Sequence, residues 1–248
     1  MKRNLVYLLA LMVVATASTQ NSQAADCKGL PSWKQLKTAL NKARTESNGG
    51  LNLDMWGTVV NRDGQVCAVA FTGNSRGDQW PGSRVISAQK AFTANSFSLP
   101  KLALSTANLF SAVQPGGSLF GLQHSNPVNT EAAYAGDAAK FGQANDPMTG
   151  KRVGGVNVFG GGLALYNGKG QLVGAIGVSG DTSCADHNIA WKARKALTLD
   201  YVPGGVSPAG DDNIIYLGKQ EAPNGFKHPH CGNKEVEITL SAIAKKQI

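Results

Sequence analysis

The chain has 248 residues, with 24 Lys and Arg against 16 Asp and Glu, and its formal net charge is +8 at pH 7. The basic residues are spread along the chain, without a run of five or an aromatic-rich basic motif, which argues against nucleic-acid binding. A modest positive field suits an anionic small-molecule ligand, although charge of this size also serves solubility.

The amino terminus has the layout of a secretory signal peptide. Lys2 and Arg3 precede an apolar stretch, residues 5–15, that is too short to span a bilayer comfortably. Small residues follow, and cleavage is acceptable after Ala17 or Ala24. We expect residues 1–25 to be a signal peptide and the mature protein to be periplasmic or secreted, without stable membrane insertion. The alternative is a membrane anchor that stays attached.

Four cysteines remain in the mature chain: Cys27, Cys67, Cys184 and Cys231. An even number in an oxidising compartment predicts two disulfides. Three pairings are possible, and the sequence alone does not choose among them. We favour Cys27–Cys67 and Cys184–Cys231, because each closes a long loop and ties one end of the chain to the fold.

In chain order, the first half predicts a helix over 32–46 that Ser32 caps, then a β-hairpin of strands 53–60 and 65–72 around a turn at 61–64. A helix rich in small residues follows at 85–97. A second short helix is expected at 105–113 and another at 130–141, within an irregular region that runs from 118 to 155.

The second half opens with a strong hairpin signal, strands 162–166 and 171–179 around Asn167-Gly168-Lys169-Gly170. Asp181 or Thr182 then caps a helix that runs through Leu197. Two hairpins separated by helices predict an α+β fold, a central antiparallel sheet flanked by helices. We expect one domain over 26–200 and a C-terminal extension, 201–248, packed on it.

Three segments resemble the GlcG/HbpS-like family, which includes the C-terminal domain of PduO corrinoid adenosyltransferases. They are residues 59–66, 87–94 and 160–186, the last being the most specific. The resemblance covers about 32–197 and implies a profilin-like fold, assembly into homo-oligomers, and haem or tetrapyrrole binding in some members. For some extracellular members it implies haem sensing with a sensor-protein partner.

One loop departs from the family pattern. Where the family has Asp-Gly-Ala after the second strand, this chain has Arg76-Gly77-Asp78, followed by Gln79-Trp80-Pro81. If that loop shapes the pocket, the choice of ligand differs from that of the family.

Haem requires an apolar slot, an axial donor and groups that bind its propionates. The chain has no Cys-x-x-Cys-His motif, so any haem is held non-covalently. His124, beside Phe120 in an apolar glycine-rich loop, is one candidate axial ligand; the alternative is a loop histidine bonded to water or backbone.

The glycine-edged hairpin and the helix after it provide the other candidates. We expect Gly180, Asp186 and His187, at the amino end of the last helix, to frame a hollow for a flat or acidic ligand. Lys90, on the small-residue helix, is a candidate partner for a propionate. The alternatives are a histidine packed beside a disulfide and a solvated lysine.

The sequence leaves open whether a metal binds. Zinc would suit a cluster of two cysteines and three histidines: Cys184, His187, His228, His230 and Cys231. Two disulfides explain the cysteines more simply. Nucleophile-elbow, phosphate-loop and paired-histidine zinc motifs are absent, and Ser179 lacks hydrolase spacing. The sequence therefore favours a haem-binding protein in haem sensing or iron handling. The alternatives are an enzyme or accessory factor acting on a small organic acid, and an oligomeric scaffold without a ligand.

Overall fold

The fold is built on a four-stranded antiparallel sheet. A computed structural model describes residues 27–218 and 225–242, so the expected signal peptide lies outside the described residues. The strands are β1 (Trp56–Asn61), β2 (Val66–Phe71), β3 (Gly162–Tyr166) and β4 (Leu172–Ser179), in the order β2-β1-β4-β3. Both predicted hairpins are confirmed, and they meet where β1 pairs with β4.

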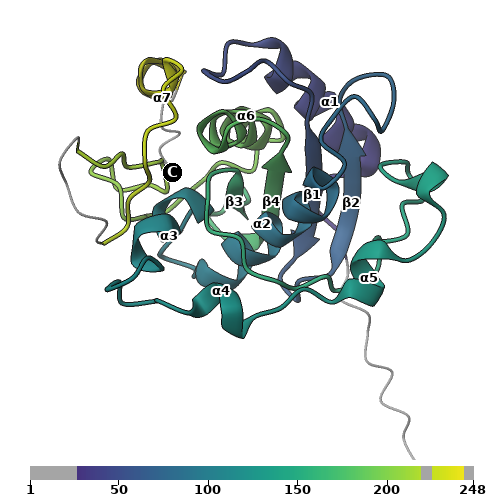
Figure 1. Cartoon of the computed structure of the whole chain (residues 1–248), viewed down its shortest axis with the longest axis horizontal. Coiled ribbons are helices and arrows are strands. Elements are labelled where there is room, and N and C mark those ends of the chain that lie inside the picture. Colours follow the sequence, from purple (N-terminus) through teal and green to yellow (C-terminus); the bar gives the residue numbers. More distant parts are fainter. Residues whose placement is uncertain (1–26, 219–224, 243–248) are drawn as a thin grey trace, which may run out of the picture.

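Helices cover both faces of the sheet (Figure 1). On one face lies α2 (Ser83–Phe97), and on the other lie α1 (Trp33–Thr45) and α6 (Ser183–Ala196). Ser32 and Gln35 form a capping box at α1, and Thr182 caps α6. The α+β fold with a central antiparallel sheet flanked by helices is therefore what the structure has. Among the described residues, no helix is both long and apolar enough to cross a membrane.

The irregular middle of the chain forms short helices rather than one long element. They are α3 (Thr106–Ala112), α4 (Leu122–Ser125), α5 (Thr130–Tyr134) and the 3₁₀ turn η1 (Ala138–Lys140). The helix predicted over 130–141 is wrong in extent, because the chain turns at Gly136 with φ +84° and cannot continue an α-helix there.

The C-terminal extension lies against α6. Asp212 is bonded to Arg194 of α6 at 2.7 and 2.8 Å, and both side chains are fully buried. A further helix, α7 (Glu235–Ala242), packs beside α6 and was not expected from the sequence. Both favoured disulfides are present, Cys27–Cys67 and Cys184–Cys231.

Helix α2 lies very close to β4 because small residues face one another. A Cβ added at Gly177 would lie 2.0 Å from the Ser87 carbonyl oxygen and 2.5 Å from the Ala91 nitrogen, both in the α2 backbone. The glycine is therefore required by the approach of helix and strand.

We predict that Gly177→Ala destabilises the protein by roughly 1–3 kcal/mol or more, because backbone has to move to relieve the overlap. Thermal denaturation measures the loss. Gly82→Ala is the control, since a Cβ there meets nothing within 4 Å and its φ of −63° suits any residue. Equal melting temperatures for the two variants would contradict the close approach.

Candidate functional site

The corner beside the second hairpin is filled by side chains. The Lys90 ammonium, fully buried, donates to Asp186 Oδ2 at 2.7 Å and to the Val178 carbonyl at 3.0 Å, and it lies 5.0 Å from the Phe159 ring. The expectation of an open hollow between the hairpin and the amino end of α6 is thus wrong. The lysine expected to be either solvated or propionate-bound already neutralises the aspartate.

Burial shifts the pKa values of both Lys90 and Asp186 against their charged forms. Desolvation raises the pKa of Asp186 to about 6, against the opposing effect of Lys90. Burial likewise lowers the pKa of Lys90, against the attraction of Asp186. Gly180 is also buried, and a Cβ there would lie 2.3 Å from the Asp54 carbonyl oxygen. The corner is therefore a packed polar core in this chain, and ligand roles for Lys90, Gly180 and Asp186 stay predictions.

His187 lies deeper in the same region. Its Nε2 accepts from the Ile214 backbone N–H at 3.2 Å, which places the proton on Nδ1, and Nδ1 has no hydrogen-bond partner among the described residues. Burial, and after it the charge of Arg194, lowers the pKa of His187 to about 3. The imidazole is neutral in the folded protein at ordinary pH.

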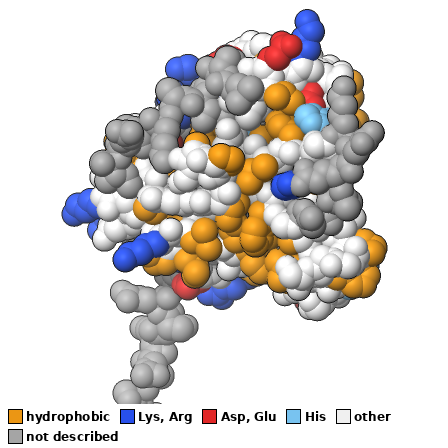
Figure 2. All heavy atoms as spheres, turned by 90° about the vertical axis from the view of Figure 1, so that its left-hand side faces the viewer, with side chains coloured by type: hydrophobic (Ala, Val, Ile, Leu, Met, Phe, Trp, Pro, Cys, Tyr) orange, Lys and Arg blue, Asp and Glu red, His pale blue; other side chains and the backbone are white. Residues whose placement is uncertain are grey.

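The other two predicted ligand residues lie apart from this corner. Phe120 and His124, at α4, are exposed, and within the described chain the imidazole makes no hydrogen bond. The neighbouring Leu119 and Leu122 pack on the hydrophobic cluster of Leu109. Figure 2 shows hydrophobic side chains gathered over the face on which α3 and the C-terminal extension lie. The structure therefore separates the six candidates into a buried group and an exposed group.

A concave apolar site occurs elsewhere, at the amino end of α2. This pocket, which we call the α2 pocket, has a volume of about 300 Å³. Its walls carry aromatic and apolar side chains together with two arginines: Trp56, Arg76, Pro81, Arg84, Val85, Tyr134 and Phe141. The loop that departs from the family pattern thus does shape a pocket, through Arg76 and Pro81.

A buried ion pair fixes the wall of the α2 pocket. Arg84 bonds both oxygens of Asp146 and donates to the Ala133 carbonyl oxygen at 2.9 Å, and its guanidinium lies 3.6 Å from the centre of the Phe141 ring. Asp146 in turn accepts from the backbone N–H groups of Gly142 and Met148. Segment 133–148 is thereby attached to α2, and Phe141 is held at the pocket.

Two side chains at the α2 pocket remain available for a ligand. Tyr134, at the end of α5, is 62% exposed, and Arg76 is exposed on the loop between β2 and α2. Neither side chain has a partner among the described residues. The Trp56 indole N–H is buried and lacks a hydrogen-bond acceptor there as well. An apolar site with a phenol and a cation suits a planar anionic molecule.

A second pocket, of about 360 Å³, is polar and lies between the end of α1 and α7. Its charged lining comprises Glu46, Asp181 and Glu237 against Arg44 and Lys234. Arg44 is already engaged, donating to the Asn52 side chain at 2.9 Å. Three acidic groups against two basic ones do not favour a small organic acid there.

Sequence reasoning missed most of the α2 pocket. Tyr134 and Trp56 are 78 residues apart in the chain, and they share a site because the segment after Tyr134 packs on α2, where Asp146 pairs with Arg84. The available signal was the unusual loop at 76–81 together with a tyrosine in a region too irregular for a plain connection.

Comparison with known proteins points to one family. A family model described as "Haem degrading protein HbpS-like" matches residues 32–195, about two thirds of the chain. A search of curated proteins finds no significant match.

Three solved structures match with TM-scores below 0.5. Klebsiella pneumoniae protein ORFY is 28% identical, with a TM-score of 0.46 over 66% of this chain and 86% of that one. The PduOC:haem complex is 24% identical, with a TM-score of 0.46 over 66% and 89%. HbpS is 20% identical, with a TM-score of 0.42 over 67% and 89%.

The burial of His187 predicts a pH-dependent contribution to stability. The pKa of His187 is about 3 in the folded protein, so the imidazole stays neutral until the pH falls that low. In the unfolded chain the same imidazole takes up a proton below about pH 6.5. Unfolding therefore binds a proton in that window, and stability falls as pH falls. The gap in unfolding free energy between wild type and His187→Gln should shrink by ~2 kcal/mol from pH 7 to pH 5.

Urea denaturation at a series of pH values measures this gap, and other titrating groups cancel because both proteins contain them. The His124→Gln variant is the control for the loss of an exposed imidazole. Parallel curves for His187→Gln and wild type would show that this histidine is not held neutral by the fold.

Proposed function

This chain belongs to the HbpS-like family, and on that basis we propose that it binds haem non-covalently in the α2 pocket. Family membership is the observation that carries the proposal. The pocket supports it, because it joins an apolar, aromatic lining to groups that suit an anionic macrocycle. A volume of about 300 Å³ holds part of a haem, so the rest of the ligand would lie over the exposed rim.

The residues present fit the requirements of haem. Trp56, Phe141 and Pro81 provide apolar contact for the macrocycle. Arg76 provides a cation for a propionate.

Tyr134 is the proposed axial ligand, since a tyrosine phenol is one of the groups that hold haem iron in proteins. Its position at the end of α5 is set by the Arg84–Ala133 hydrogen bond one residue earlier. Bound haem would supply iron and a redox-active macrocycle. His124, the axial candidate from the sequence, lies outside the lining of this pocket.

We also propose a location, a process and partners for this function. The signal-peptide pattern supports export to the periplasm or the medium, where the protein would take part in haem sensing or iron handling, with a sensor protein as partner. The apolar face seen in Figure 2 supports assembly as a homo-oligomer, because a large apolar patch is uncommon on a monomer.

Haemin titration tests the binding proposal. The purified protein should show a saturable Soret shift beyond that of a non-specific control protein. Tyr134→Phe removes the oxygen donor and keeps the ring, so it should change the Soret spectrum and weaken binding at least about tenfold. Arg76→Ala should weaken binding and leave the spectrum of the bound form unchanged.

His124→Ala is the matched control and should bind as wild type does. If this variant loses the shift and Tyr134→Phe keeps it, haem binds at α4 instead of the α2 pocket. If the wild-type protein gives no specific shift, the proposed function is wrong.

Export is tested by expressing the whole chain in a bacterial host and fractionating the cells. We expect the protein in the periplasm or medium, and amino-terminal sequencing should begin at Ser18 or Ala25. Retention of the intact amino terminus in the membrane fraction would support the anchor instead.

A further inference from the structure

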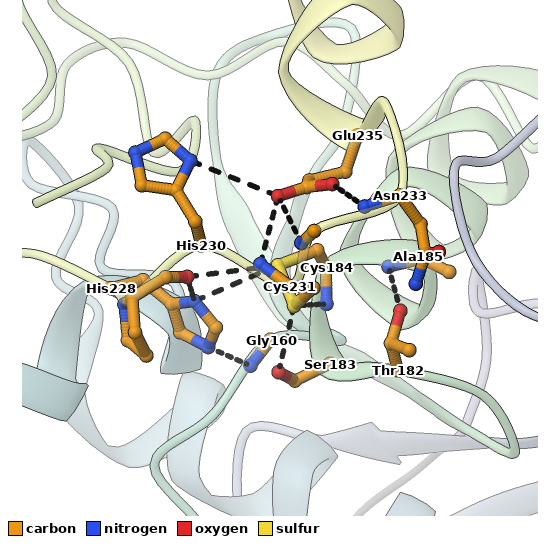
Figure 3. Close-up of a disulfide and its surroundings, with 12 residues drawn as sticks. Gly160, Thr182, Ser183, Cys184, Ala185, His228, His230, Cys231, Asn233 and Glu235 are labelled. Atoms are coloured by element: carbon orange, nitrogen blue, oxygen red, sulfur yellow. Dashed lines mark hydrogen bonds and ion pairs between the residues drawn. A yellow bond between two sulfur atoms is a disulfide. The ribbon is translucent and has the colours of Figure 1, made fainter. Parts of the chain in front are cut away.

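A group of metal-ligating side chains surrounds the second disulfide, away from the α2 pocket. The sulfur atoms of Cys184 and Cys231 and a ring nitrogen of His228 all lie within 4.8 Å of one another. Cys184 is in the first turn of α6, whereas His228 and Cys231 precede α7 (Figure 3). In Figure 1 this region and α5 lie on opposite sides of the molecule.

His228 faces the disulfide from inside the protein. The side chain is 1% exposed, and its Nδ1 lies 3.9 Å from Cys184 Sγ and 2.7 Å from the Pro229 carbonyl oxygen. The other ring nitrogen, Nε2, accepts from the Gly160 backbone N–H at 3.5 Å, so the ring proton is on Nδ1, which donates it to the Pro229 carbonyl oxygen. The Nδ1 edge is thus directed at the sulfur atoms, as Figure 3 shows. Two sulfurs and an imidazole are a donor set typical of zinc.

The two sulfur atoms differ in access and in electrostatic surroundings. Cys184 is fully buried and Cys231 is half-buried, so Cys231 is the more accessible residue of the pair. That sulfur lies 3.3 Å from the Cys184 backbone N–H and 3.6 Å from the Ser183 hydroxyl, at the amino end of α6. Helix amino ends stabilise thiolates, so the reduced form of Cys231 is favoured at this position.

Contacts other than the disulfide hold the C-terminal segment in place. The Glu235 carboxylate accepts from the backbone N–H groups of Cys231, Gly232 and Asn233 at 2.7 to 3.1 Å. Thr239 of α7 donates to Asn188 of α6 at 2.9 Å. Breaking the sulfur–sulfur bond therefore leaves His228 and Cys231 beside Cys184.

We propose that reduction of the Cys184–Cys231 disulfide creates a binding site for Zn²⁺ or a similar thiophilic divalent cation, with Cys184, Cys231 and His228 as ligands. Two thiolates on a tetrahedral zinc are separated by about 3.8 Å, given Zn–S bonds of ~2.3 Å. The Cα atoms of the two cysteines are 6.1 Å apart while the disulfide is intact. Three protein ligands leave one coordination position for water or another molecule.

The redox step balances with an external dithiol. One thiolate of the dithiol attacks Cys231 Sγ, the bond to Cys184 breaks, and Cys184 leaves as a thiolate. The second thiolate then attacks the mixed disulfide and releases Cys231. The dithiol becomes a disulfide, and the protein gains two electrons as two thiols. Metal binding displaces the thiol protons and moves the His228 ring proton from Nδ1 to Nε2.

Co²⁺ is the probe, because cobalt bound to thiolates gives a charge-transfer absorption that cobalt on oxygen and nitrogen ligands lacks. We expect no such band with the oxidised protein. After treatment with a dithiol and its removal under anaerobic conditions, we expect one Co²⁺ per chain, displaced by Zn²⁺. His228→Ala should lower the affinity at least about tenfold, whereas His230→Ala, at an exposed neighbouring histidine, should not.

The other disulfide is the matched control, since Cys27 and Cys67 belong to no metal-ligating cluster among the described residues. A Cys27→Ser, Cys67→Ser variant should keep the band, and a Cys184→Ser, Cys231→Ser variant should lose it. The proposal is overturned if the reduced protein gives no stoichiometric band. It is overturned equally if the second variant keeps the band, or if circular dichroism shows that reduction unfolds the chain and metal does not restore it.

Discussion

The buried ion pair between Arg84 and Asp146 is the interaction on which the proposed ligand site depends. Arg84 belongs to α2, which packs tightly on the sheet, and Asp146 belongs to a segment with little regular structure. Breaking such a pair from one side leaves an uncompensated buried charge, which typically costs ~3–5 kcal/mol. The pair, with the bonds that Asp146 accepts from Gly142 and Met148, therefore gives an irregular loop a fixed position.

A second buried pair on the same helix has the opposite consequence. Lys90 extends past the carboxyl end of β4, where it bonds the Val178 carbonyl oxygen, to Asp186. Its side chain fills the corner where the glycine-edged hairpin meets α6. A Cβ at Gly161 would lie 2.2 Å from the Val178 carbonyl oxygen and 3.1 Å from the ammonium nitrogen, so this corner has no room for a further side chain. One helix thus closes a cavity near its middle and supports an open pocket at its amino end.

The C-terminal extension adds a third set of polar contacts, centred on α6. Arg194 pairs with Asp212, His187 accepts from Ile214, and the Cys184–Cys231 disulfide joins the start of the helix to the segment before α7. Hydrogen bonds and an ion pair accompany the covalent link, so the extension does not depend on the disulfide alone. This redundancy lets a redox change at Cys231 be local.

By itself the sequence determined the local elements and their pairing. The local elements are predicted by short-range signals: the period of apolar residues, the caps at Ser32 and Thr182, and the turn at 167–170. Each signal indicates the type of element and its approximate boundary. The disulfide pairing was a preference, which the structure bears out. The family resemblance at 59–66, 87–94 and 160–186 is also visible in the sequence. Each of these segments is local, a hairpin or a helix with its turn.

Only the tertiary structure decided which side chains share a site. Lys90 was read as a surface or ligand-binding cation, but a residue 96 positions away neutralises it, and no local pattern encodes that distance. Tyr134 reaches the pocket of Trp56 and Arg76 with its segment, which Arg84 and Asp146, 62 positions apart, attach to α2 by an ion pair. Secondary structure follows from contacts between near neighbours in the chain, whereas cavities and charge pairs follow from which distant residues the packed sheet and helices bring into contact.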